Sequence, residues 1–206
     1  MSNFVDNIDY VSTGFLNTVN DAVIGGLLSS GTGSSPRAGQ LGKIVNLKQD
    51  EAAKRYGSAS VVLYGGLYQY VQFKAGSTAA NAQGQLVFWD TAANKGSESY
   101  IVTPDAPTVP SMMAGVALNA VTKGQYGWIQ IAGLATVKFC AAITKVSPVA
   151  GDLVVLDLTP TNTADVLADA TGLTSVQMRA VIGKAYDAPV SGALKRVLLN
   201  MGFINV

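Results

Sequence analysis

The stretch Gly84-Gln85-Leu86-Val87-Phe88-Trp89-Asp90 places a turn glycine before four apolar residues and an acidic residue. The same pattern returns 67 residues later as Gly151-Asp152-Leu153-Val154-Val155-Leu156-Asp157. A short apolar run that begins after a turn is typical of a β-strand. Because neither run alternates with polar residues, we expect both strands to be covered on both faces, by the other half of the chain or by another subunit.

The repeat continues beyond these two strands. Four small residues recur at a shift of 68, and the next apolar pair, Ile129 and Ile131, matches Val197 and Leu199. Chance is the alternative, since glycine and alanine are common in this chain. We predict an all-β fold, a barrel or sandwich of short strands made from two related repeat units of approximately residues 68–134 and 135–201, within a β domain of residues 41–206. The four matched small residues are Gly115, Ala117, Ala120 and Gly124, paired with Gly183, Ala185, Ala188 and Gly192.

The N-terminal residues differ from this pattern. Apolar side chains at Phe4, Ile8, Val11 and Phe15 are spaced by three or four positions, as on one face of a helix. A stretch rich in glycine and serine follows at residues 29–39 and indicates a flexible linker. Residues 1–40 are therefore predicted to form an N-terminal arm or helix with a linker. The apolar face either packs on its own domain or orders against a partner.

The composition excludes two classes of partner. Hydrophobic residues make up 49% of the 206 residues, and the net charge is only +1, without a basic stripe that would bind nucleic acid. The longest apolar run, Ala22–Leu28, is far shorter than the ~20 residues that span a membrane. The apolar excess favours a surface that is partly buried in a protein assembly, with a compact, weakly charged β-domain as the alternative.

Residues suited to catalysis are sparse. The chain has no histidine, which excludes histidine-based triads and histidine metal sites, and its single cysteine, Cys140, is interpreted as core packing. The segment from Asp157 to Asp165 lacks the alternating acids of a calcium loop. We therefore predict no enzyme activity, no catalytic residue, no cofactor and no metal. The remaining acids are interpreted as solvated turn residues: Asp152, Asp157, Asp165 and Asp169.

A second pattern lies between the two copies of the strand motif. The run Ala114-Gly115-Val116-Ala117 leads through a turn at Gly124 to Gly127-Trp128-Ile129-Gln130-Ile131-Ala132-Gly133. This pattern resembles the capsid decoration proteins (cement or head-stabilising proteins) of tailed bacteriophages. The resemblance covers roughly residues 60–200, and its motifs specify turns and strands rather than chemistry.

The resemblance implies a virion protein on the outer surface of the capsid. Such a protein bridges neighbouring subunits of the major capsid protein and stabilises the shell by mass action, because it binds only the assembled state. It also implies a homo-oligomer, a dimer or a trimer. The predicted contact element is the N-terminal apolar face formed by Phe4, Ile8, Val11 and Phe15.

Two other functions fit the sequence. One is a head-fibre or tail component, in which the β module is a base and the N-terminal segment forms a trimeric stalk. The other is a carbohydrate-binding β module that uses Trp89, Tyr126 or Trp128 as a platform for a sugar ring. Exposure of these aromatic rings distinguishes the carbohydrate-binding function from the structural ones.

Overall fold

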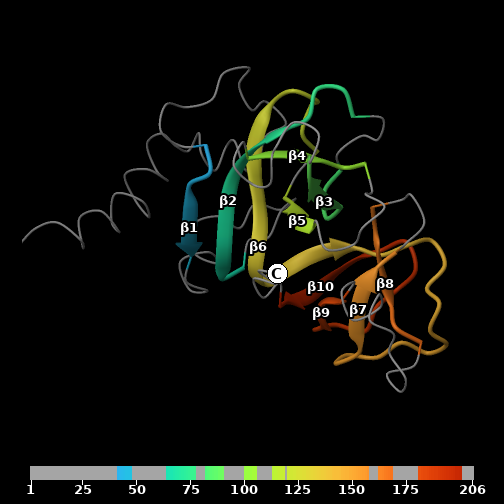
Figure 1. The fold of residues 1–206 in the computed structure, drawn as a ribbon. Helices are drawn as coiled ribbons and strands as arrows, with labels where there is room; N and C mark the ends of the chain where they lie inside the picture. Colours follow the sequence, from blue (N-terminus) through green and yellow to red (C-terminus); the bar gives the residue numbers. More distant parts are fainter. Residues whose placement is uncertain are drawn as a thin grey trace, which may run out of the picture.

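The computed structural model describes residues 41–47, 64–77, 82–90, 100–105, 113–118, 120–157, 162–168 and 181–200. These residues form ten strands in one continuous sheet, and none of them is helical (Figure 1). None of the described residues therefore belongs to a helix that could cross a membrane. The predicted all-β fold is confirmed. The predicted arm and linker, residues 1–40, lie outside the described residues.

The first unit is a closed barrel of five strands. Around its wall the order is β2–β4–β3–β5–β6, and β6 pairs back with β2. The β2–β4 pair is parallel and the other four pairs are antiparallel. The strands are β2 (Gly66–Phe73), β3 (Leu86–Trp89), β4 (Ile101–Thr103), β5 (Met113–Ala117) and β6 (Tyr126–Lys138).

The second unit repeats this order with the second half of β6 in the place of β2. Along the sheet the order is β6–β10–β9–β7–β8, and a parallel bridge between Phe139 and Ala164 joins the two ends. This bridge corresponds to the parallel pair Phe73–Val102 of the first unit. The strands are β7 (Leu153–Leu156), β8 (Ala164–Val166), β9 (Val181–Ala185) and β10 (Leu194–Leu199).

Pairing registers show that the two units are related. Val87 lies opposite Gly115 in the first unit, and Val154 lies opposite Gly183 in the second. The irregularity that follows each of these pairs also falls at the same place, directly after Val87 and directly after Val154. A β-bulge is a specific local feature, so its recurrence at the aligned position supports two related units rather than chance similarity of composition.

Strand β6 is shared by both units. Its first half pairs with β2 and β5, and its second half, from Gly133, pairs with β10. The strand changes direction between the two halves, and the second unit begins there (Figure 1). The expected boundary between residues 134 and 135 falls inside this strand.

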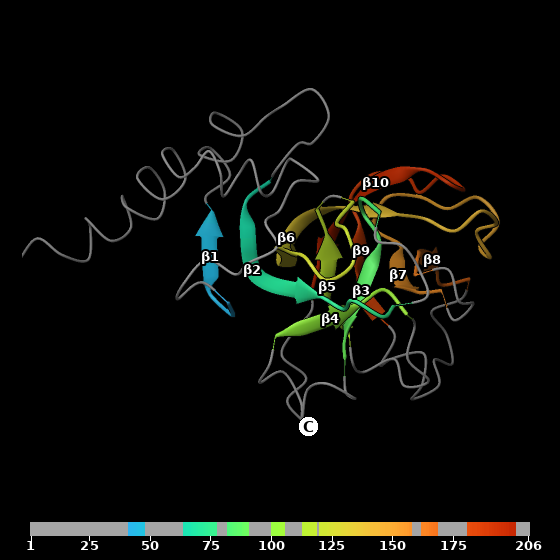
Figure 2. The same cartoon turned by 90° about the horizontal axis from the view of Figure 1, so that it is seen from above.

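Strand β1 (Ile44–Leu47) lies outside the first barrel and pairs with β2 (Figures 1 and 2). It is a third copy of the motif that begins at Gly84 and Gly151. In each copy a glycine with φ between 76° and 91° is followed, two residues later, by a four-residue strand. This additional copy reads Gly42-Lys43-Ile44-Val45-Asn46-Leu47 and was not predicted from the sequence.

Each unit has its own apolar core, and β3 contributes to both. Val87 packs in the core of the first barrel, whereas Leu86 and Phe88 belong to the cluster that fills the second unit. All three side chains are fully buried. The prediction that this strand is covered on both faces is confirmed, and the covering element on the second face is the other unit.

Alanine substitution of the turn glycines Gly84 and Gly151 can be compared to test whether the first unit packs against the second at Gly84. Gly84 and Gly151 both have positive φ, so alanine at either position costs about 1–2 kcal/mol of backbone strain. A Cβ at Gly84 would also lie 2.9 Å from the Lys138 backbone nitrogen and against Leu194, whereas one at Gly151 would meet no described atom within 4 Å.

We therefore expect Gly84→Ala to lower the free energy of unfolding by roughly 1–3 kcal/mol more than Gly151→Ala does, because of overpacking between the units. Urea denaturation of both variants and the unchanged protein measures the difference. Equal losses would contradict the packing of the Gly84 turn against the second unit.

Candidate interaction surface

The acidic residues of the second unit are engaged in local structure. Asp152 accepts a hydrogen bond from the Val149 backbone N–H at 2.8 Å and forms an ion pair with Lys145. Burial raises the pKa of Asp152, but these two partners outweigh it, so the pKa is lowered overall. Asp165 accepts from the Thr144 backbone N–H at 2.9 Å and from the Thr144 hydroxyl. These carboxylates fix the loop that leads from β6 to β7.

An ion pair holds the loop between β9 and β10. The Arg196 guanidinium donates two hydrogen bonds to Asp187, at 2.7 and 2.5 Å, and lowers the pKa of that carboxyl. The centre of the Tyr186 ring lies 4.5 Å from the central carbon of the Arg196 guanidinium, within range of a cation–π contact. Because Asp187 and Tyr186 already compensate the charge of Arg196, we interpret this arginine as a residue that stabilises the β9–β10 loop.

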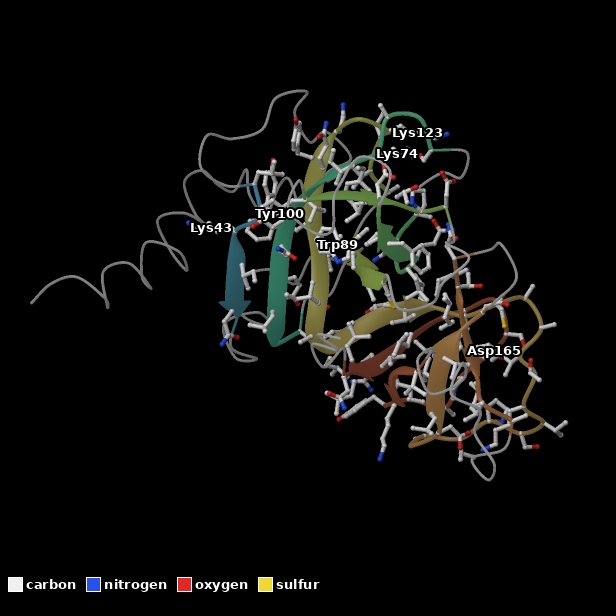
Figure 3. All side chains as sticks on the ribbon, in the orientation of Figure 1. Lys43, Lys74, Trp89, Tyr100, Lys123 and Asp165 are labelled. Atoms are coloured by element: carbon white, nitrogen blue, oxygen red, sulfur yellow. The ribbon has the colours of Figure 1, made fainter. Side chains whose placement is uncertain are left out.

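The described residues contain no group of three or more histidine, cysteine, aspartate or glutamate side chains that could hold a metal ion. Asp165 lies in the second unit, well separated from Lys74 and Trp89 of the first (Figure 3). Asp157 accepts from the Thr163 hydroxyl at 3.2 Å, and Asp169 lies outside the described residues. The acids interpreted above as turn residues thus have local structural partners where they are described.

Cys140 is a buried thiol. Only 7% of the residue is exposed, and its sulfur donates to the Ala142 carbonyl at 3.2 Å. Burial, together with the nearby carboxylates of Asp165 and Asp157, raises the pKa of the thiol to about 11. A thiol that stays protonated at neutral pH is a poor nucleophile and metal ligand. The interpretation of Cys140 as a packing residue agrees with this environment.

The aromatic rings proposed as a sugar platform are mostly internal. Trp128 is 2% exposed and Tyr126 is 9% exposed, and both pack against Tyr70. Trp89 is partly buried and meets the edge of the Tyr100 ring. Neither Tyr126 nor Trp128 offers an exposed face for stacking, so the carbohydrate-binding alternative loses two of its three residues.

The two units differ in one row of side chains on the outer side of the strands. In the first unit the row runs across β2, β6, β5 and β3, and every member is at most 2% exposed. We call it the closed row: Tyr68, Gln130, Val116 and Leu86. The second unit covers part of it, because Leu86 and Val116 belong to the apolar cluster of that unit.

In the second unit the aligned row crosses β6, β10, β9 and β7. Leu198 is 51% exposed, Lys184 is exposed, and the other two members are half-buried. We call it the open row: Leu134, Leu198, Lys184 and Leu153. Within the described residues Leu153–Leu156 is covered on one face only, because no third unit follows there to cover the other. Cover of the second face by another subunit stays a prediction.

Exposed apolar side chains also occur on the loops next to the open row. Val149 lies in the turn that leads into Leu153 and is 54% exposed. Val146, in the same loop, is 88% exposed, and Val190 of the β9–β10 loop is 49% exposed. The Ile143 N–H donates to the Ser191 hydroxyl at 3.3 Å, which ties the two loops together. This end of the second unit is an apolar surface of the kind that binds proteins.

The residues predicted as the partner contact, Phe4, Ile8, Val11 and Phe15, lie outside the described residues, so that prediction stays open. The open row was not predicted from the sequence. Its one sequence signal is Lys184, which stands at the position of Val116 in an otherwise similar strand.

Comparisons with known proteins give limited information. No family model matches the chain, and no curated protein matches its sequence. Among solved structures, the chain is similar to the head fiber gp8.5 N base of bacteriophage phi29, at 15% identity and a TM-score of 0.43. The alignment covers 65% of this chain and 95% of the other. At this TM-score the likeness carries no argument about function, and the resemblance to capsid decoration proteins stays a prediction.

We expect the Cys140 thiol to react slowly with a disulfide reagent at pH 8, because it is buried and its pKa of about 11 leaves almost no thiolate. Unfolding in urea should increase the rate by orders of magnitude. Reaction of the folded protein at the rate of the unfolded chain would contradict the buried position of Cys140.

Proposed function

We propose that this chain is a non-enzymatic structural protein of a phage virion. It binds the outer surface of the capsid and stabilises the shell by bridging subunits of the major capsid protein. The observation that carries the proposal is the exposed apolar end of the second unit, formed by the open row and the loops beside it. The sequence resemblance to capsid decoration proteins supplies the identity of the partner.

The physical mechanism is differential binding. A protein that contacts two neighbouring subunits binds only where the shell has brought them together, and it therefore favours the assembled state. Burying the exposed half of Leu198 or Val149 contributes roughly 1 kcal/mol each. Single contacts of this size are weak, but contacts from several linked protomers act together through avidity.

The fold suits this role. The described residues form one continuous sheet that encloses two apolar cores. The two units share strand β6. Such a fold keeps the distance between its two ends fixed. A bridge of fixed length resists separation of the subunits that it connects.

The first test is sedimentation of the full chain with empty shells. We expect saturable co-sedimentation, and a rise in the melting temperature of the shell with increasing occupancy. Unassembled capsid protein is the control and should not be retained. Absence of co-sedimentation at a large excess of the chain would overturn the proposed function.

The second test concerns the predicted arm. Removal of residues 1–30 should weaken shell binding, because Phe4, Ile8, Val11 and Phe15 are expected to contact the capsid. Light scattering of both forms measures the oligomeric state. A stable trimer that depends on residues 1–30 and does not bind along the shell surface would favour the head-fibre alternative instead. Unchanged binding after truncation would remove the arm from the contact.

A further inference from the structure

We propose that the open row of the second unit, together with the turn from Val149 to Gly151, docks onto an edge strand of the capsid protein. The open face is defined here as Val149, Leu153, Lys184, Leu198 and Leu134. The proposal rests on the proposed function for the identity of the partner, and on the internal repeat for the mode of contact.

The same face of the first unit shows how such a contact is made. The Gly84 carbonyl accepts a hydrogen bond of 2.8 Å from the Lys138 N–H, on the edge of β6 that faces away from β10. Two residues later, the Leu86 N–H donates to the Asn162 carbonyl at 2.9 Å. The face therefore combines two backbone hydrogen bonds to the second unit, one of them to the edge of β6, with apolar packing of Leu86 and Val116.

Strand β1 pairs with β2 at the other end of the molecule through a different set of hydrogen bonds. The Gly42 N–H donates to the Tyr70 carbonyl at 2.8 Å, and the Tyr70 N–H donates to the Lys43 carbonyl at 3.0 Å. A Cβ at Gly42 would overlap the Tyr100 ring, so the turn lies directly on that ring. Lys43 and Tyr100 lie beside β1 and β2 in Figure 3. The two bonds with Tyr70 match those that Gly84 and Gln85 make with Ala117, and those that Gly151 and Asp152 make with Ala185. The copy at Gly84 also bonds through its carbonyl to the unit that follows.

The copy of the motif at Gly151 has the same local structure but no described unit after it. Its N–H donates to the Ala185 carbonyl at 2.7 Å, as the Gly84 N–H donates to Ala117 at 2.8 Å. Val149 and Asp152 form the same turn as Ala82 and Gln85, with a side-chain oxygen accepting the first backbone N–H in each case. The docking geometry is therefore present, and its apolar side chains are exposed.

A second copy of this chain fits the open face poorly. The strand edge that it would have to offer is that of β2, where the Tyr70 N–H already donates to Lys43 and the Gln72 N–H donates to Tyr100. β1 occupies this edge. Lys184 adds a cost, because a lysine in the place of the buried Val116 would lose its hydration without a partner.

The expected partner of the open face is therefore a different protein with three features. It presents a strand edge for backbone hydrogen bonds, apolar side chains opposite Leu153 and Leu198, and an acceptor oxygen for the Lys184 ammonium. Strand addition of this kind gives affinity through the main chain and specificity through the side chains that alternate along it.

The experiment uses shell binding by the full chain. Val149→Asp and Leu198→Asp should each weaken binding roughly tenfold or more, because each places a charge in an apolar contact. Ala82→Asp is the matched control, since Ala82 is exposed and holds the same turn position in the first unit. It should leave binding within about twofold, below the ~1.4 kcal/mol that a tenfold change represents. Both Val149 and Leu198 are about half exposed, and unchanged melting temperatures verify that the variants fold.

Site-directed cross-linking gives an independent readout. A photoreactive maleimide on Val149→Cys should couple to the capsid protein on the shell, and the same reagent on Ala82→Cys should not. Cross-links between two copies of the chain, or variants that bind as well as the unchanged protein, would overturn the docking face while leaving the proposed function intact. Failure of the unchanged protein to bind shells would overturn both.

Discussion

Strand β6 belongs to both units at once, and the way its backbone groups are paired connects the first unit to the second. Its first half is paired on both edges by β2 and β5. Its second half pairs with β10 on one edge, and the N–H of Lys138 on the other edge would be left without a partner inside the molecule. A buried, unpaired N–H is costly, so the edge must be closed. The Gly84 carbonyl closes it, and this bond ties the first unit to the second.

The two ends of the repeat differ because each end lacks a neighbouring unit on one side. In a chain of stacked units each unit covers the face of its neighbour, and the terminal units need a cap. At the start of the described chain β1 serves as this cap, because it reproduces the strand motif of a unit without the rest of the barrel. At the other end the aligned face carries Leu153 and Leu198, with Lys184 as its one charged member. The described sheet therefore begins with β1, whose Ile44 is itself 49% exposed, and ends in an aligned face that is apolar.

The sequence predicts much of this fold but not the open face. The repeated strand motif and the aligned glycines indicated two related β units, because turn and strand signals are local. Leu86–Trp89 and Leu153–Leu156 look equivalent by the same signals, yet one is covered on both faces and the other is not. Coverage depends on which unit follows in space, and the pattern within one strand cannot report it. The copy at Gly42 was missed because Asn46 interrupts its apolar run.

Lys184 gives the open face its selectivity. Its aliphatic stem can lie along Leu153 and Leu198 while the ammonium remains in water, so the free protein tolerates the exposed apolar row. Contact with a surface that lacks an acceptor would strip water from the ammonium without replacing it, and that cost opposes stacking of further copies. A partner with a carboxylate or a carbonyl opposite the ammonium removes the cost. Three of the four aligned positions differ between the two rows, and the lysine in the place of Val116 is the difference that adds a charge. It disfavours a sister unit on this face, which is specificity obtained by disfavouring the wrong partner.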